Sequence, residues 1–283
     1  MAEHLLPDQY QWHILYGNPG SLYSYPVSDF QEETAERLSQ GSLLVAYIGH
    51  GEPDMLAWAV GESGDRERIF GFDDIPLVTD ASASLAVFTA CSAGKFDAVG
   101  DRPSIIEALF MDEHGPVAAY SSSAWINGAS NGQLVVDLFS ILLAERSQTV
   151  GDWIYSVESN PKKLFSNNNL IAWLILRSLS SFSNMNDGVK IASHEYTQEL
   201  FALQHHSYNL FGDPATRIAF PETGIDISLS FPWLPAARKV HFQGASELPA
   251  GTTVKVQLAR LPGLNTFRED GTLHSSTPYE LWL

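Results

Sequence analysis

A histidine between two glycines follows an apolar run of the sequence. The stretch "LLVAYIGHGEP" covers residues 43–53 and places His50 between Gly49 and Gly51. An imidazole gains or loses a proton near neutral pH, so this histidine is a candidate general acid or base. Taken alone, the pattern is more typical of a turn residue that satisfies backbone groups.

The chain has one cysteine, Cys91, directly after a second apolar run, "SLAVFTA". A single cysteine excludes an intrachain disulfide and leaves three roles open: buried filler, metal ligand or nucleophile. A free thiol has a pKa of about 8.5, so a nucleophilic cysteine at neutral pH needs a base beside it. Buried filler is the commoner role of a free cysteine, so Cys91 alone does not decide the matter.

The surrounding segments predict how these side chains are positioned. Continuous apolar runs at 42–49, 84–90 and 116–123 are typical of parallel strands buried on both faces. Helices are predicted next to these runs: one with Ser28 as its N-cap precedes the run at 42–49, and one with a capping box of Ser104 and Glu107 lies between the other two. This alternation predicts an α/β domain with a mostly parallel sheet flanked by helices.

Functional groups of open α/β sheets collect beyond the carboxyl ends of the strands. His50 and Cys91 each follow such an end, so we expect the two side chains to meet at one edge of the sheet. Gly51 leaves room for a substrate carbonyl, and the N–H groups of Gly51 and Cys91 could point at a developing oxyanion. Together the two motifs predict nucleophilic catalysis by a thiol and its base.

The length and net charge of the chain limit the classes of function that it can have. The 283 residues are enough for one large α/β domain and a smaller one. A net charge of −17 opposes binding to nucleic acid and to anionic membranes. The N-terminal sequence has no basic segment of an export signal, and no run reaches the roughly 18 to 20 apolar residues of a membrane span.

The two motifs, "AYIGHGEPD" and "FTACSAGKFD", resemble the His-Gly and Ala-Cys motifs of caspase-fold cysteine peptidases of clan CD, most closely the gingipain-like family C25. The segments "SIIEALF", "PVAAYSSSAWING" and "YNLFGDPATRI" also fit that family. The resemblance implies a caspase-like fold and endopeptidase cleavage of proteins or peptides without a cofactor. His50 would be the general base or acid, Cys91 the nucleophile, and the amides of Gly51 and Cys91 the oxyanion hole.

The resemblance also implies a substrate pocket. Trp125, after the third strand, would line the pocket for the side chain N-terminal to the scissile bond, although a core or lid role fits an aromatic there equally well. Asp54 is the acid that we assign to the pocket; Glu52 and Asp97 are also close to the motifs. An acid near a catalytic loop is usually only solvated. We identify no metal ligands and no third catalytic residue.

The pattern of apolar and polar residues changes near Pro221. We therefore expect a caspase/gingipain-like peptidase domain at 1–220 and a partial immunoglobulin-like β domain at 221–283, where apolar and polar residues alternate. Only about 42 residues precede the His-Gly strand, fewer than the family has. We expect a shortened member or a fragment, whose N-terminal part a further chain or segment could complete.

Two other functions remain open at this stage. One is a catalytically inactive caspase-fold module for binding or scaffolding, and the other is a cysteine-dependent transpeptidase or ligase that uses the same thioester. The cellular location also stays open, because gingipain-like peptidases are generally secreted or at the cell surface.

Overall fold

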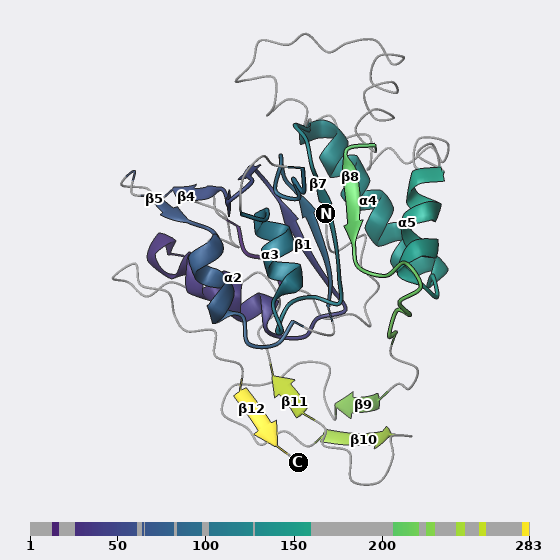
Figure 1. Cartoon of the computed structure of the whole chain (residues 1–283). Coiled ribbons are helices and arrows are strands. Elements are labelled where there is room, and N and C mark those ends of the chain that lie inside the picture. Colours follow the sequence, from purple (N-terminus) through teal and green to yellow (C-terminus); the bar gives the residue numbers. More distant parts are fainter. Residues whose placement is uncertain are drawn as a thin grey trace.

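A four-stranded sheet lies at the centre of the computed structural model, with the strand order β1-β6-β7-β8 (Figure 1). Its strands are β1 (Leu44–Ile48), β6 (Leu85–Thr89), β7 (Ala118–Ser122) and β8 (Tyr208–Phe211). The β1–β6 and β6–β7 pairs are parallel, and β8 is antiparallel to β7. The structure describes residues 13–16, 26–60, 64, 66–81, 84–97, 102–126, 128–159, 206–220, 225–229, 242–246, 255–258 and 279–282.

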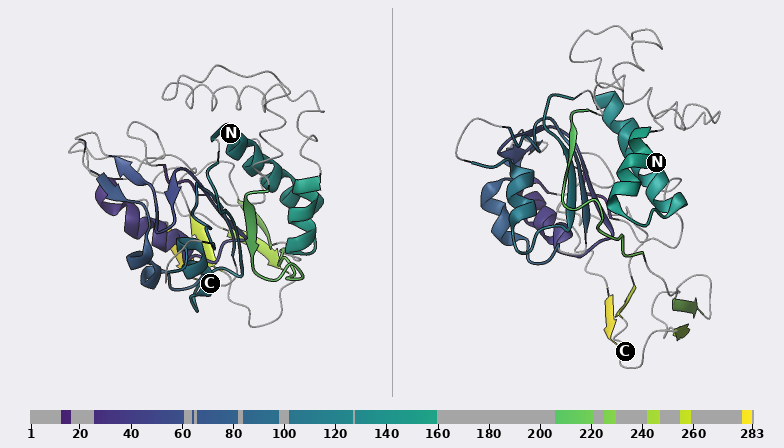
Figure 2. Two further views of the ribbon diagram at one scale, coloured as in Figure 1. Left: turned by 45° about the horizontal axis from the view of Figure 1, so that its top comes forward. Right: turned by 45° about the vertical axis from the view of Figure 1, so that its right-hand side comes forward.

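Helices cover both faces of this sheet (Figures 1 and 2). One layer contains α2 (Phe30–Leu38), η2 (Phe72–Leu77) and α3 (Ile105–Met111); the other contains α4 (Gly128–Glu145) and α5 (Val150–Ser159). Side chains of β6 alternate between the layers: Ala86 and Phe88 pack with the first, and Leu85 and Val87 with the second. The mostly parallel sheet flanked by helices is therefore confirmed, and β6 is buried on both faces as its apolar run predicts.

The same burial was predicted for β1, and that prediction was wrong. The strand is only half-buried, and the side chain of Ile48 at its end is 55% exposed. In the part of the chain that the structure describes, β1 has a single neighbour, β6, so it lacks the second flanking strand that would cover it. Its apolar residues therefore reach solvent at the edge that carries His50.

The two predicted helix caps have different outcomes. Ser104 caps α3: its hydroxyl accepts the N–H of Glu107 at 3.4 Å, and the Glu107 carboxylate accepts the Ser104 N–H at 2.8 Å. This capping box is confirmed. Ser28 does not cap α2, because a 3-10 turn, η1 (Val27–Asp29), precedes the helix. Its hydroxyl instead donates to the carboxylate of Asp29 at 2.7 Å.

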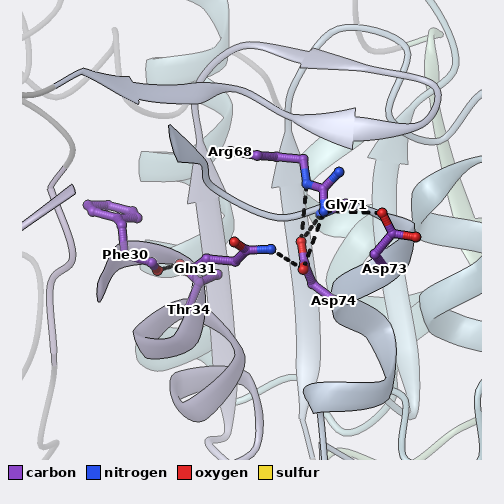
Figure 3. Close-up of polar contacts among 7 residues, drawn as sticks. All are labelled: Phe30, Gln31, Thr34, Arg68, Gly71, Asp73 and Asp74. Atoms are coloured by element: carbon purple, nitrogen blue, oxygen red, sulfur yellow. Dashed lines mark hydrogen bonds and ion pairs between the residues drawn. The ribbon is translucent and has the colours of Figure 1, made fainter. Parts of the chain in front are cut away.

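A buried carboxylate joins three elements of the first helical layer (Figure 3). Asp74, 2% exposed, accepts the backbone N–H of Gly71 at 2.7 Å and lies 3.3 Å from the Nε atom of Arg68. The side-chain amide of Gln31 on α2 also donates to Asp74. Asp73, on the exposed side, lies 3.5 Å from the Arg68 guanidinium. The cluster fixes α2 and η2 beside the hairpin that follows His50.

The segment that follows His50 leads from β1 to η2. The structure adds four short strands to it: β2 (Gly51–Glu52), β3 (Met55–Leu56), β4 (Trp58–Val60) and β5 (Arg66–Arg68). They form two antiparallel pairs, β2 with β3 and β4 with β5. The chain after His50 therefore turns back at once, which keeps the histidine segment short.

Beyond residue 221 the structure describes two antiparallel ladders. One pairs β9 (Ile225–Leu229) with β10 (Phe242–Ser246), and the other pairs β11 (Lys255–Leu258) with β12 (Tyr279–Trp282). Two separate ladders do not establish an immunoglobulin-like sandwich, so that assignment and the boundary near 221 stay predictions.

Candidate active site

The register of β1 and β6 brings His50 and Cys91 to corresponding positions. Ile48 pairs with Thr89 at the end of the parallel ladder, and the Gly49 N–H donates to the Thr89 carbonyl at 3.3 Å. His50 and Cys91 follow Ile48 and Thr89 by the same number of residues. The structure thus places both at the carboxyl edge of adjacent strands. The His50 side chain is exposed and Cys91 is half-buried.

The histidine and cysteine segments touch at Gly51. A Cβ atom added to Gly51 would lie 2.7 Å from the Ala90 Cβ atom and 3.2 Å from the Cys91 carbonyl oxygen. Both distances are below normal contact, so only glycine lets the two segments come this close. Gly51 was predicted to leave room for substrate; the structure also gives it the task of accepting the cysteine segment.

The turn that carries Cys91 is held by the loop after β7. The Cys91 thiol donates to the Ile126 carbonyl, with a sulfur–oxygen distance of 3.6 Å, and the Ser92 N–H donates to the Ala124 carbonyl at 3.0 Å. Ser92 has a φ of 54°, in the left-handed region that non-glycine residues seldom adopt. Such conformations persist where the surroundings impose them, often at functional sites. Trp125 lies between the two carbonyl acceptors, with 89% of its side chain exposed.

Two further contacts fix the base of this turn. The Gly94 N–H donates to the Ser122 carbonyl of β7 at 2.9 Å, and a Cβ atom at Gly94 would lie 2.9 Å from the Ser121 Cβ atom. The Ile106 N–H of α3 donates to the Ala93 carbonyl at 3.2 Å. The small residues Ala93 and Gly94 therefore let the turn pack directly on the sheet and on α3.

Tyr47 is a site residue that the sequence reasoning missed. Its hydroxyl donates to the His50 carbonyl at 2.7 Å and accepts the Ala57 N–H at 3.3 Å. A Cβ atom at Gly49 would lie 2.6 Å from the same hydroxyl, so Gly49 makes room for the tyrosine. The φ of Gly49 is not in the left-handed region, so it is the space for the tyrosine hydroxyl that requires glycine here. A large side chain two residues before a glycine was the available signal.

Two stacked tyrosines lie behind the site. The rings of Tyr120 and Tyr208 are 5.1 Å apart at an angle of 25°. The Tyr208 hydroxyl donates to the Asn131 side chain at 2.8 Å, and the Tyr120 hydroxyl donates to Glu158 at 3.0 Å. Burial raises the pKa of both tyrosines; the thiol of Cys91 adds to the rise in the pKa of Tyr208. Both tyrosine hydroxyls therefore stay protonated near neutral pH.

The acid assigned to the substrate pocket lies in the hairpin after His50. Asp54 is exposed at the turn between β2 and β3. The neighbouring Pro53 carbonyl accepts the Ile105 N–H at 2.6 Å, which ties this turn to the start of α3. The turn thus has a fixed position, although no described contact joins Asp54 to the cysteine turn.

Over the described ranges the structure has neither a metal-binding cluster nor a membrane-spanning helix. No group of three or more His, Cys, Asp or Glu side chains there is arranged to hold a metal ion. Among the helices of the same ranges, none has the length and apolar character needed to cross a membrane.

Two solved structures are similar to this chain. The structure is similar to the crystal structure of the Arg-specific cysteine proteinase gingipain R (RgpB), with a TM-score of 0.48 and 17% identity over 89% of this chain and 51% of that one. It is also similar to the complex of Porphyromonas gingivalis RgpB pro- and mature domains, with a TM-score of 0.47 and 15% identity over 92% of this chain and 49% of that one. The chain therefore spans about half the length of these structures.

No curated protein matches the sequence. The sequence model of peptidase family C25 matches residues 1–219, which is most of the chain. The match includes both the His-Gly and the Ala-Cys motifs. The chain belongs to peptidase family C25.

Proposed function

We propose that this chain is a cysteine endopeptidase that cleaves peptide bonds through a thioester on Cys91, with His50 as general base and general acid. The observation that carries the proposal is the β1–β6 register, by which His50 and Cys91 follow paired strand ends at corresponding positions of the chain. Membership of family C25 supports the same reaction class.

The chemistry needs one proton carrier and one nucleophile. His50 takes the thiol proton of Cys91 as the sulfur attacks the peptide carbonyl carbon and a tetrahedral oxyanion forms. The oxyanion collapses, the carbon–nitrogen bond breaks, and the imidazolium returns the proton to the leaving amine. Water then attacks the thioester with His50 again as base, which releases the acid product and restores the thiol.

The amides of Gly51 and Cys91 are the proposed donors to the oxyanion. The close approach of Gly51 to Ala90 and to the Cys91 carbonyl supports this, because it brings the two segments that carry these amides together. A donor of this kind contributes roughly 10²- to 10³-fold to the rate.

Trp125 and Asp54 are the proposed pocket residues. The carbonyls on either side of Trp125 hold the cysteine turn, and the exposed indole is proposed to cover a substrate side chain from this loop. Asp54 would select a basic side chain by charge. A preference for Arg or Lys that Asp54→Asn leaves unchanged would remove Asp54 from the pocket.

The proposal is tested by turnover of a fluorogenic peptide library by wild type, Cys91→Ala and His50→Ala. Both variants should lose at least about 10³-fold in kcat/KM, because nucleophile and base act as one unit. His114→Ala is the matched control: it removes an imidazole that is half-exposed after α3 and should keep full activity. Equal turnover by wild type and Cys91→Ala would reject the peptidase.

The same assay addresses the remaining functions. Addition of a free amine separates hydrolysis from ligation, since a transpeptidase would give the amide in place of the acid. A wild-type protein that turns over no peptide would favour the binding or scaffolding module. That a further chain or segment completes the N-terminal part of the domain stays a prediction.

A further inference from the structure

We infer that the Tyr47 hydroxyl positions the oxyanion donor: by holding the His50 carbonyl, it sets the direction of the Gly51 N–H. The inference rests on the proposed function, because an oxyanion forms only if Cys91 attacks a carbonyl. It assigns Tyr47 as a positioning residue that acts on the rate without touching substrate.

The first step concerns the His50 carbonyl, which is held by two donors. The Tyr47 hydroxyl donates to it at 2.7 Å and the Ala57 N–H at 3.2 Å. The Ala57 N–H is also 3.3 Å from the Tyr47 oxygen, so the three groups form a closed triangle. The tyrosine hydroxyl is the shortest contact in that triangle and the only side chain in it.

The second step concerns the peptide unit that joins His50 to Gly51. It is trans, as are all peptide bonds of the described chain, so its N–H points opposite to its carbonyl. With the carbonyl fixed toward Tyr47 and Ala57, the Gly51 N–H must point away from them. Rotation of this peptide would move the carbonyl off the tyrosine.

The hydrogen-bond pattern of the β2–β3 hairpin independently indicates the same direction for the Gly51 N–H. Gly51 pairs with Leu56, but the Leu56 N–H donates to the Phe70 carbonyl at 2.8 Å. The ladder bond next to this pair runs from Ala57 to His50, which makes Gly51–Leu56 a pair without direct hydrogen bonds. The Gly51 N–H therefore points away from β3 and is not consumed by the hairpin.

Tyr47 itself is held firmly enough for this role. Its ring contacts Phe88 of β6 at 6.4 Å between centroids, and Gly49 leaves space for its hydroxyl. Burial raises the pKa of Tyr47 to about 12, so the hydroxyl keeps its proton and remains a donor throughout the neutral range. Phenylalanine would keep the ring and lose only the donor.

Tyr47→Phe is the test, with Tyr155→Phe as the matched control on an exposed residue of α5. Three assays are made on the full chain: turnover of the best library peptide, which gives kcat and KM; inhibition by the corresponding peptide aldehyde; and the rate of thiol alkylation by iodoacetamide. The aldehyde adds the thiol across its carbonyl and places its oxygen where the oxyanion forms, whereas alkylation develops no charge at that position.

A loosened donor should lower kcat by about tenfold or more, short of the roughly 10²-fold cost of losing a donor outright. KM should stay within a factor of two, and the aldehyde should bind weaker by about the factor lost in kcat. Alkylation should be unchanged, which a general collapse of the site would not allow. The Tyr155→Phe protein should match wild type in all three.

Several results would overturn the inference. One is unchanged kcat and aldehyde binding in Tyr47→Phe, and another is an alkylation rate that falls with kcat, which would place the effect on the thiol. Failure of the variant to fold, seen by circular dichroism, would assign the hydroxyl to stability instead. If wild type and Cys91→Ala turn over peptide equally, the proposed function has failed and Tyr47 is not at issue.

Discussion

The substitution Gly51→Ala should impair catalysis much more than it lowers the stability of the fold. In Gly51→Ala the new Cβ atom would start 2.7 Å from the Ala90 Cβ atom, whereas carbon atoms prefer about 3.5–4.0 Å, so something must move by about 1 Å. Ala90 is completely buried and cannot yield. The shift must therefore fall on the segments that carry His50 and Cys91. Overpacking of this kind costs about 1–3 kcal/mol.

The effect on the reaction should be much larger than the effect on folding. A misplacement of about 1 Å in a catalytic group costs about 10²-fold in rate, so kcat/KM of Gly51→Ala should fall by about that factor. The assay is fluorogenic peptide turnover below the melting temperature, paired with urea denaturation of the same sample.

Gly151→Ala provides the matched control for crowding. Its Cβ atom would lie 2.9 Å from the Cβ atom and 2.9 Å from the carbonyl oxygen of Pro214. That contact is near the amino end of β7, since Gly212 packs against Val117 and Ala118, so it is at the opposite edge from Cys91. It should change stability and leave kcat/KM within a factor of two. Equal activity of the two variants would refute the steric argument.

The other predictions concern stability. Asp74→Ala should lower the free energy of unfolding by about 1–3 kcal/mol, because it leaves the buried Gly71 N–H without its acceptor and leaves Arg68 only the more exposed Asp73 as a partner. Asp73→Ala, which removes an 86% exposed carboxylate, should cost less than about 1 kcal/mol; equal losses in urea denaturation would contradict this. Burial raises the pKa of Tyr47 to about 12, so the folded protein holds a proton that the unfolded chain releases near pH 10. The stability due to Tyr47 should be intact below about pH 10 and lost as the pH rises through about 12, amounting to about 3 kcal/mol. Urea denaturation across that interval should show a shallower decline for Tyr47→Phe than for Tyr155→Phe.

The pairing of His50 with Cys91 could be predicted because it depends on chain topology alone. Continuous apolar runs predict buried parallel strands, and the carboxyl ends of such strands meet at one edge. No side-chain conformation is needed for that conclusion. The register of Ile48 with Thr89 then refines the expectation from the same edge to corresponding positions.

Capping patterns in the sequence predicted the helix start less well where a second partner was available to a capping side chain. Ser104 and Glu107 satisfy each other's backbone amides, and this box could be read from spacing. Ser28 had the same spacing to Gln31, but Gln31 donates to Asp74, a residue far away in the sequence. The Gln31 side chain is therefore bound to a buried carboxylate far away in the sequence and not to the backbone of Ser28. Helix α2 begins at Phe30, after the 3-10 turn that contains Ser28. Spacing within one segment cannot report such a competitor.

The role of Tyr47 was out of reach for a related reason. Alternation along β1 places its ring in the core with Phe88, and sequence reasoning assigns it to packing alone. Only the hairpin after His50, which returns Ala57 to the same hydroxyl, gives that ring a polar contact. The hairpin strands are too short for hydrophobic periodicity to reveal them.

The two glycines around His50 have different causes, and the difference explains why a histidine can be held there. Gly49 is small because the Tyr47 hydroxyl lies above it, and Gly51 is small because Ala90 and the Cys91 carbonyl lie against it. Neither depends on a left-handed φ. A larger residue at either position would push the histidine away from one neighbour while the other still held it. The backbone of His50 is thus fixed from two sides while its side chain remains exposed, which fits the role of acid and base proposed for it.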